Sequence, residues 1–390
     1  MSLMETCCVI ARISDTERHV GCIFMNVVRI AFCGTLPGGG GSAKVERFCF
    51  NLDYFNNGIW NEMKMIQDPQ LHLRAANLPN IIHSRWANST HTKYEPAWEK
   101  WQEWCKRFPE SSPLPADPFY LALYINDLVL DDCKHGALVA AANGIRYGHV
   151  IAGFSNPMED IFVKTALEGA KRIVGLNTVH RQKEPITSDM IKLIVDTYAK
   201  PKNLMNHRFV ITCLLGFSGF LRTCELLEIH VKDVSFDTEC MKILIPKSKN
   251  DQVREGHVVY ITRSSSHYCT VHWVEKYLDD TNLRKTPASF VICRLAKTKA
   301  GHKALGHMPI SDTTIREEFL KLIVPIRLRL GDGAYGLHSL RSGGASCAIN
   351  SGVSERLVGK HGRWKSGYSR DRYLKDDKKS RLSVTKAMGL

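Results

Sequence analysis

The sequence lacks the patterns that mark several large functional classes. It has no Gly-x4-Gly-Lys-Ser/Thr loop, and the run from Gly38 to Ser42 is typical of flexible backbone, which argues against a phosphate-binding loop. The 13 cysteines are an odd number without repeated short spacings. This distribution argues against a disulfide scaffold or a paired zinc module, and it favours a reducing, intracellular compartment.

Long apolar runs are also missing. The apolar patch from Cys22 to Val28 ends at Arg29 and is too short to span a bilayer. Glu5 and the lack of a clear small-residue cleavage site argue against a signal peptide. We therefore predict a soluble protein with no membrane partner.

Acidic residues are in deficit. The chain holds 39 Asp and Glu against 53 Lys and Arg, a formal net charge of +14. Residues 341–390 contain 12 Lys and Arg but 4 Asp and Glu, so 12 − 4 = +8 of that surplus lies in the last part of the chain. Such a surplus favours a polyanionic partner, double-stranded DNA first and an anionic membrane surface second. The basic run Lys375 to Arg381 is also compatible with a nuclear address, which predicts a nuclear location if the host is eukaryotic.

Length and periodicity predict two folded domains. Residues 1–80 show no sustained periodicity and are expected to form a poorly ordered extension. Residues 85–178 are expected to form a four-helix domain, in which Tyr94, Trp98, Trp101 and Cys105 share one helix face. The polar segment 179–185 reads as a linker.

The second domain, 186–390, is predicted to be helical with one small antiparallel sheet, so the fold class is mainly α with a small sheet (α+β). Two apolar runs, 241–246 and 257–261, flank a basic stretch and predict a β-hairpin. The expected helices of this domain cover 206–227 in two pieces, 270–280, 311–323, 338–350 and 354–360.

Basic and aromatic residues recur where the apolar pattern predicts burial. Arg222 lies in the apolar segment GFLRTCELLEI, and a buried guanidinium needs an anion. Glu225, one helical turn later, could be that anion in a purely structural pair. His338 and Arg341 are three residues apart and therefore share a helix face. The small residues that follow them, at 343–348, predict that this helix lies close to another backbone.

The order of these residues resembles the catalytic set of the tyrosine recombinase, or phage integrase, family. Arg341 and Trp364 are 364 − 341 = 23 residues apart, and Trp364 and Tyr373 are 373 − 364 = 9 apart, which matches the family's register. Asp233 falls where the family's first strand begins. The resemblance covers residues 85–380, and within the family the sequence is similar to the XerD-like integrases of mobile elements. It implies that 85–178 is a core-binding (SAM-like) DNA-binding domain and 186–390 the catalytic domain.

The resemblance also implies roles for the site residues. Arg222 and Arg341 would hold the scissile phosphate, His338 would accept a proton, and Tyr373 would attack to form a covalent 3′-phosphotyrosine. Trp364 stands where most members have histidine, as in Cre recombinase, and an indole can donate a hydrogen bond but cannot accept a proton.

A hairpin lysine would protonate the leaving 5′-oxygen. Lys249 fits the family pattern better than Lys247, which stays the alternative, and Glu225 supports the site. No carboxylate cluster with metal-ligand spacing accompanies the set, so we expect no metal and no cofactor. Tyr368 is a second phenol in the same segment, but it lies only four residues beyond Trp364.

Three functions are compatible with this set. The first is a site-specific DNA recombinase or integrase that acts as a homotetramer on two DNA sites. A type IB topoisomerase shares the chemistry, and a catalytically retired, DNA-binding copy of a mobile-element protein shares the residues. The separate helical domain favours the recombinase.

Overall fold

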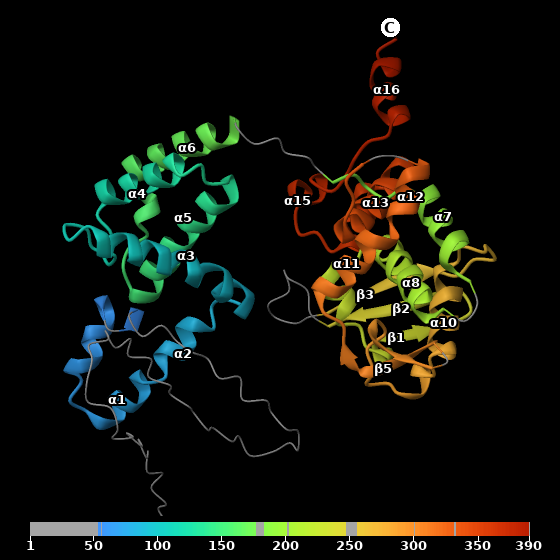
Figure 1. Ribbon diagram of the computed structural model, residues 1–390, viewed down its shortest axis with the longest axis horizontal. Helices are drawn as coiled ribbons and strands as arrows, with labels where there is room; N and C mark the ends of the chain where they lie inside the picture. Colours follow the sequence, from blue (N-terminus) through green and yellow to red (C-terminus); the bar gives the residue numbers. More distant parts are fainter. Residues whose placement is uncertain are drawn as a thin grey trace, which may run out of the picture. The chain divides into compact units, whose positions relative to one another are not determined.

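The computed structural model describes residues 54–55, 57–176, 183–200, 203–246, 256–299, 301–330 and 333–389. The chain divides into two compact units between Val179 and His180 (Figure 1). Within the described ranges, no helix has the length and apolar character needed to cross a membrane.

The first unit is helical around an aromatic core. Trp98 and Trp101 are fully buried on α3, which packs against α5, and α4 packs against α6. A Cβ at Gly148 of α5 would lie 2.4 Å from the Trp98 ring, so glycine allows the two helices to approach. The elements of this unit are η2 (Gly58–Met65), α1 (Pro69–Ala75), α2 (Leu78–His83), α3 (Asn88–Arg107), α4 (Pro118–Leu130), α5 (His135–Ala152), η3 (Pro157–Glu159) and α6 (Ile161–Leu176).

Helical structure begins earlier than the sequence predicted. We expected residues 1–80 to be poorly ordered, but 58–83 form η2, α1 and α2. Trp60 is buried, and its indole donates a hydrogen bond to the Ile151 carbonyl at 2.7 Å. The three elements are short and leave apolar residues such as Leu73 and Ile81 exposed, so they show no amphipathic period. Residues 1–53, and 179–182 of the predicted linker, lie outside the described residues.

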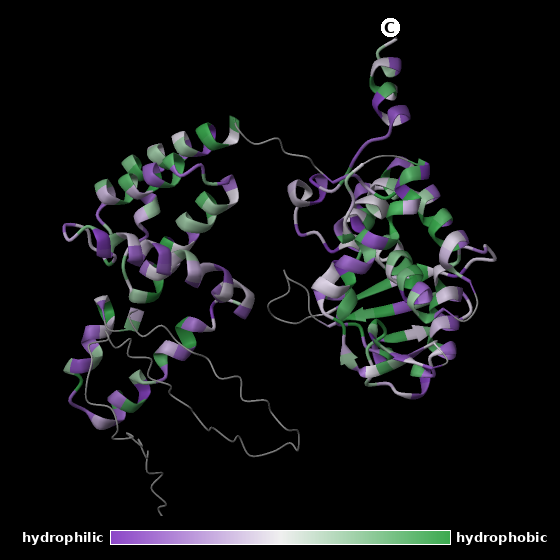
Figure 2. Cartoon of the chain, viewed as in Figure 1, coloured by the Kyte–Doolittle hydropathy of each residue, from purple (hydrophilic) through white to green (hydrophobic). Residues whose placement is uncertain are grey.

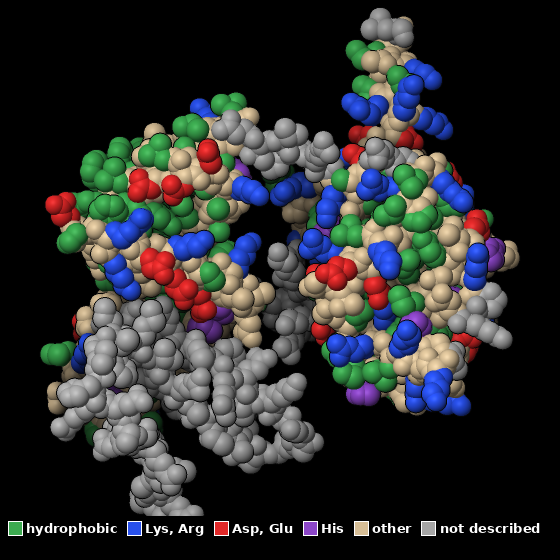
Figure 3. Space-filling model, in the orientation of Figure 1, with side chains coloured by type: hydrophobic (Ala, Val, Ile, Leu, Met, Phe, Trp, Pro, Cys, Tyr) green, Lys and Arg blue, Asp and Glu red, His purple; other side chains and the backbone are tan. Residues whose placement is uncertain are grey.

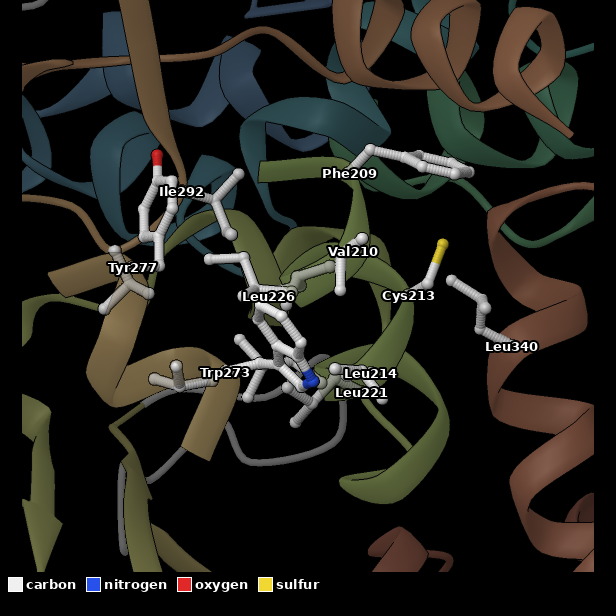
Figure 4. Close-up of a cluster of buried hydrophobic side chains, with 14 of the residues drawn as sticks. Phe209, Val210, Cys213, Leu214, Leu221, Leu226, Trp273, Tyr277, Ile292 and Leu340 are labelled. Atoms are coloured by element: carbon white, nitrogen blue, oxygen red, sulfur yellow. The ribbon is translucent and has the colours of Figure 1, made fainter. Parts of the chain in front are cut away.

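The second unit is built around α8, which is buried along most of its length. Figure 4 shows α8 residues among side chains from neighbouring elements: Phe209, Val210, Cys213 and Leu214 lie near Trp273, Ile292 and Leu340. The helices α7, α10 and α13 all pack against α8. The helices of this unit are α7 (Ser188–Tyr198), α8 (Leu204–Ser218), α9 (Thr223–Leu227), α10 (Thr270–Asp280), α11 (Asp312–Leu322), α12 (Val324–Leu330), α13 (Leu337–Asn350), α14 (Glu355–Gly362), α15 (Gly367–Asp371) and α16 (Lys378–Ala387), with short 3-10 turns η4 (Val231–Asp233) and η5 (Leu283–Lys285).

Two small antiparallel sheets complete the unit. β1 (Val234–Phe236), β2 (Cys240–Ile245) and β3 (His257–Thr262) form the first, and Ile243 is paired with both Val234 and Val259. The predicted hairpin is therefore present, and its strands include apolar segments (Figure 2). The second sheet, β4 (Cys293–Thr298) and β5 (Gly301–Pro309), was not predicted. The fold class, mainly α with small antiparallel sheets, is confirmed.

The small residues after Arg341 place α13 against other backbone, as predicted. A Cβ at Gly343 would lie 2.0 Å from the Ile186 carbonyl oxygen, and one at Gly344 would lie 2.0 Å from that of Phe217. Both glycines are buried. The close approach fixes Arg341 relative to the end of α8.

Gly344→Ala tests this close approach. We expect the free energy of unfolding to fall by about 1–3 kcal/mol, because the methyl group overlaps backbone that cannot give way cheaply. Gly359→Ala on α14 is the control, since among the described residues nothing outside the local backbone of its own helix lies within 4 Å of the point that its new methyl group would occupy. That variant should be neutral or gain up to about 1 kcal/mol from helix propensity. Equal stability of the two variants in urea denaturation would contradict the close approach.

Candidate active site

Arg222 lies where α8 gives way to α9. It is the N-cap residue of α9, and its backbone N–H donates to Glu225 Oε2 at 2.9 Å. Its guanidinium Nη1 donates to Glu225 Oε1 at 2.6 Å, and the Arg222 side chain is 11% exposed. The carboxylate therefore caps the helix and holds the guanidinium at the same time.

Arg341 lies on α13 and is completely buried. Its two terminal nitrogens donate to the carbonyls of Phe220 and Gly362, which belong to different segments of the unit. Its Nε has no hydrogen-bond partner among the described residues. Glu225 Oε2 lies 4.0 Å from Arg341 Nη1, so the same carboxylate faces both arginines.

Trp364 and Tyr373 lie over the Arg341 guanidinium. The Arg341 Cζ is 4.2 Å from the Trp364 ring centroid and 5.3 Å from that of Tyr373, and the two ring centroids are 5.4 Å apart. The Trp364 indole nitrogen is buried and has no partner within the described part of the chain. Tyr368, by contrast, is 78% exposed on α15. The structure thus brings Tyr373, rather than Tyr368, beside the arginine.

Tyr373 follows α15 and is held through its backbone. Its carbonyl accepts hydrogen bonds from Ser342 Oγ and Ser346 Oγ of α13, and its N–H donates to the Arg370 carbonyl. The segment between Trp364 and Tyr373 contains the five-residue helix α15. The two serines attach the tyrosine segment to the helix that carries Arg341.

His338 lies at the start of α13, one turn before Arg341, with its side chain exposed. Partial desolvation, with the positive charges of Arg341, Lys183 and Arg222, lowers the pKa of His338, while Asp312 opposes the shift. The imidazole is therefore neutral near pH 7 and able to accept a proton. Both candidate general acids, Lys247 and Lys249, lie outside the described residues.

Arg363 is a third arginine of the site, and the sequence analysis missed it. Its side chain is 5% exposed, and its Nη2 donates to Glu225 Oε2 at 2.6 Å. The sequence feature that could have drawn attention to Arg363 is its position directly before Trp364, in Gly-Arg-Trp. Its partner Glu225 is 138 residues away in the sequence, and nothing local indicates that contact.

The charges of the cluster do not balance. Arg222, Arg341 and Arg363 contribute +3 and Glu225 contributes −1, which leaves 3 − 1 = +2 around one carboxylate. Burial alone would raise the pKa of Glu225, but Arg363, Arg222 and the Arg222 N–H outweigh it and hold that pKa below its usual range. Burial and the neighbouring arginines lower the pKa of Arg341 to about 9, so the guanidinium stays charged at neutral pH. An excess of buried positive charge with free N–H donors suits an anion.

One group of possible metal ligands occurs in the described ranges, and it is poorly arranged. His83, His91 and Glu95 lie close together in the first unit. His91 Nε2 donates to the His83 carbonyl at 3.1 Å, and Nδ1 lies 2.5 Å from the Tyr147 hydroxyl, so both ring nitrogens are engaged. The His83 and His91 rings stack in parallel at 3.5 Å, which keeps their lone pairs from converging on one ion.

Comparison with known proteins gives this arrangement its context. Residues 184–380, which are 197 of the 390 residues, match the model of the phage integrase family. The chain belongs to this family. A curated relative, the integrase/recombinase xerD homolog of Selenomonas ruminantium, is 29% identical over 292 residues, 74% of this chain and 82% of the relative. The protein is a tyrosine-type site-specific recombinase that binds DNA.

The fold is similar to that of solved recombinases. The XerH site-specific recombinase, in a post-cleavage complex with its palindromic difH substrate, superposes with a TM-score of 0.53 and 13% identity. The match covers 85% of this chain and 87% of that chain. The likeness extends over both units of the recombinase, although it concerns fold alone.

Glu225→Gln tests whether the carboxylate holds the arginines together. Removing a buried counter-charge should lower the free energy of unfolding at pH 7 by about 3 kcal/mol. Because the folded-state pKa of Glu225 is depressed, its contribution is present above the unfolded-state pKa, near 4.3, and is lost as the pH falls through the folded value. The gap between the two proteins should therefore narrow below about pH 4.

The control for this measurement is Glu228→Gln, an exposed carboxylate at the end of α9. Urea denaturation compares each of the two variants with the unaltered chain at pH 7 and at pH 3.5. A gap that is as wide in acid as at pH 7, or no wider than that of the control, would contradict the role assigned to Glu225.

Proposed function

We propose that the recombinase cleaves and rejoins DNA through a covalent 3′-phosphotyrosine formed on Tyr373. The observation that carries the proposal is the convergence of Arg222, Arg341, Trp364 and Tyr373 around one excess of positive charge. In-line attack on a phosphodiester raises the charge on the phosphoryl group from −1 toward −2. A site with two uncompensated positive charges, held by buried partners, suits that change.

The chemical step balances without an outside reactant. The Tyr373 oxygen bonds to phosphorus and its proton passes to neutral His338, while the bond from phosphorus to the 5′-oxygen breaks. Lys249, or Lys247 in its place, supplies the proton that the departing oxygen needs. Reversal with a different 5′-hydroxyl reseals the strand and regenerates the phenol.

Access to Arg341 needs a movement. Arg341 has no exposed surface, because the rings of Trp364 and Tyr373 cover it. We infer that these rings shift when a phosphate enters. The Arg341 Nε and Trp364 Nε1 donors, which lack partners among the described residues, would then face the phosphate oxygens.

Tyr373→Phe tests the nucleophile. The substitution removes the attacking oxygen and leaves the arginines, so DNA affinity should change by less than about twofold while covalent adduct disappears, since rates fall by several orders of magnitude when a nucleophile is removed. The matched control is Tyr368→Phe, which should still form adduct. Denaturing electrophoresis of labelled DNA detects the covalent adduct. The DNA carries either a sequence recovered with the protein from its source cells or a site selected for binding to it.

Two results would overturn the assignment. Adduct formed by Tyr373→Phe would exclude Tyr373, and an adduct peptide that contains Tyr368 would move the role there. Absence of adduct from the unaltered chain on DNA that it binds tightly would favour the retired DNA-binding copy. Relaxation of plasmid without any recombination site would favour the topoisomerase reading.

We further propose that the recombinase works as a homotetramer on two DNA sites. No residue of α16 is buried. Even its apolar residues Leu382 and Val384, and Met388 directly after it, are 45%, 63% and 64% exposed. The same unit carries a groove of about 600 Å³ whose lining includes Phe217, Phe220 and Leu357. Basic and apolar side chains both occur on α16 (Figure 3). Val384 and Met388, four residues apart, share a face of this helix that covers nothing in the described part of its own chain, and such a face suits the apolar groove of a neighbouring copy.

Val384→Asp tests this assembly. A charge on the apolar face should abolish assembly beyond the monomer or dimer on DNA, since desolvating a carboxylate in an apolar groove costs several kcal/mol, on the order of a 100-fold loss of affinity or more. Ser383→Asp is the control on the polar side and should assemble normally. Analytical ultracentrifugation of the DNA complexes distinguishes them. Tetramers formed equally by both variants would contradict the role of α16.

Two finer assignments stay proposals. Origin in a mobile element rests on the similarity to integrases. A nuclear location rests on the basic run Lys375 to Arg381 and applies only to a host with a nucleus, whereas the curated relative comes from a bacterium. Tagged protein in its own host would locate it directly.

A further inference from the structure

Arg363 occupies an unusual backbone position beside the site. It is the C-cap of α14, with φ 60° and ψ 38°, a left-handed conformation that residues with a Cβ seldom adopt. The preceding residue must be glycine, because a Cβ at Gly362 would lie 1.8 Å from the Trp364 ring. An arginine held in such a turn, directly before a site residue, requires compensating contacts.

The Arg363 guanidinium makes those contacts. Its Nη2 donates to Glu225 Oε2 at 2.6 Å and to the Phe220 carbonyl at 3.1 Å. Its Nη1 donates to the carbonyls of His361 at 2.9 Å and Gly219 at 3.4 Å. Three of these hydrogen bonds join the end of α14 to the turn between α8 and α9, and the fourth closes the turn at the end of α14 itself.

Two of the four acceptors of Arg363 also bind the other arginines of the site. Glu225 also binds Arg222, and the Phe220 carbonyl also accepts from Arg341. Phe220 itself has a positive φ of 46°, so two left-handed residues meet at this point. Strained backbone of this kind is retained where surrounding contacts determine it, and it is concentrated at functional sites.

The donor counts separate Arg363 from its neighbours. A guanidinium has five N–H groups. Arg363 uses four of them on protein acceptors, whereas Arg341 uses two and Arg222 uses one within the described residues. Arg222 and Arg341 thus keep most of their donors for a ligand, whereas Arg363 keeps one, its buried Nε–H, which has no partner among the described residues.

We propose that Arg363 is a positioning residue of the recombinase. It sets the place of Arg222 through the shared Glu225 carboxylate, that of Arg341 through the shared Phe220 carbonyl, and that of Trp364 through the turn it closes. It does not contact the phosphate. This inference rests on the proposed function, because the geometry it maintains is that of the phosphate-binding arginines.

Arg363→Gly removes the guanidinium in a residue type that accepts the left-handed backbone. We expect DNA affinity within about twofold of the unaltered chain and single-turnover cleavage about 100-fold slower, the loss that a displacement near 1 Å causes in a catalytic site. Added guanidinium ion should restore part of the rate by entering the vacated position. Arg363→Lys, which keeps the charge but lacks the planar fork, should remain slow.

The pH profile distinguishes positioning through Glu225 from loss of folded protein. Arg363 helps to hold the pKa of Glu225 low, so without it that pKa rises and Glu225 takes up a proton at a higher pH. The loss of rate that follows protonation of Glu225, on the acid side of the His338 titration, should therefore begin at a higher pH. A smaller folded fraction would lower the rate equally at every pH. Adding Glu225→Gln to Arg363→Gly should slow cleavage less than Glu225→Gln does alone in the unaltered chain.

A readout independent of cleavage completes the test. The Glu225 carboxyl can be titrated by carbon-13 NMR, and its pKa should be higher in Arg363→Gly. An unchanged Glu225 titration, or cleavage by Arg363→Gly at the rate of the unaltered chain, would overturn the role of Arg363. Absence of covalent adduct from the unaltered chain would instead overturn the proposed function, so the two failures are distinguishable.

Discussion

One buried carboxylate determines where the positive charges of the recombinase lie. Glu225 is 1% exposed and faces Arg222, Arg363 and Arg341 at 2.6, 2.6 and 4.0 Å. An isolated buried guanidinium would be costly, and three of them without a counter-ion would repel one another. The carboxylate offsets part of that repulsion and leaves the remainder available to an anionic substrate. The surrounding fold keeps the four side chains in reach.

The helix α13 brings the other site residues to Glu225. Gly343 and Gly344 bring α13 against the Ile186 and Phe217 carbonyls, and this contact puts Arg341 next to the turn that carries Arg222. Ser342 and Ser346, from the same helix, hold the carbonyl of Tyr373. A single helix therefore positions the second arginine and the proposed nucleophile together.

Most elements of the fold could be predicted from the sequence, and the exceptions have physical reasons. The helix over 270–280 follows from its apolar period, and the hairpin strands follow from two apolar runs with clear breaks. The β4–β5 sheet escaped prediction because its strands are half exposed and rich in lysine, glycine and histidine. The first helical turns, over 58–83, escaped because they are too short for a period to appear.

The site shows the same division. Arg222, Arg341, Trp364 and Tyr373 could be found because their order and spacing are characteristic of a family, and the structure places them together. Arg363 stands out in the sequence only as the neighbour of Trp364, because its contacts are with a carboxylate and a carbonyl more than 130 residues away. The role of His338 as proton acceptor is still a prediction. So is that of Lys249, which lies outside the described residues.

The most direct test of the central claim is to remove the phosphate charge that the arginines are proposed to balance. A methylphosphonate at the scissile position replaces a charged non-bridging oxygen by a neutral methyl group, so less negative charge develops during attack. The comparison is the adduct yield of Arg341→Ala on phosphodiester and on methylphosphonate DNA. The account predicts little or no adduct on the phosphodiester and substantial adduct on the methylphosphonate. Equal failure on both substrates would contradict it, because Arg341 would then serve something other than the charge on the phosphate.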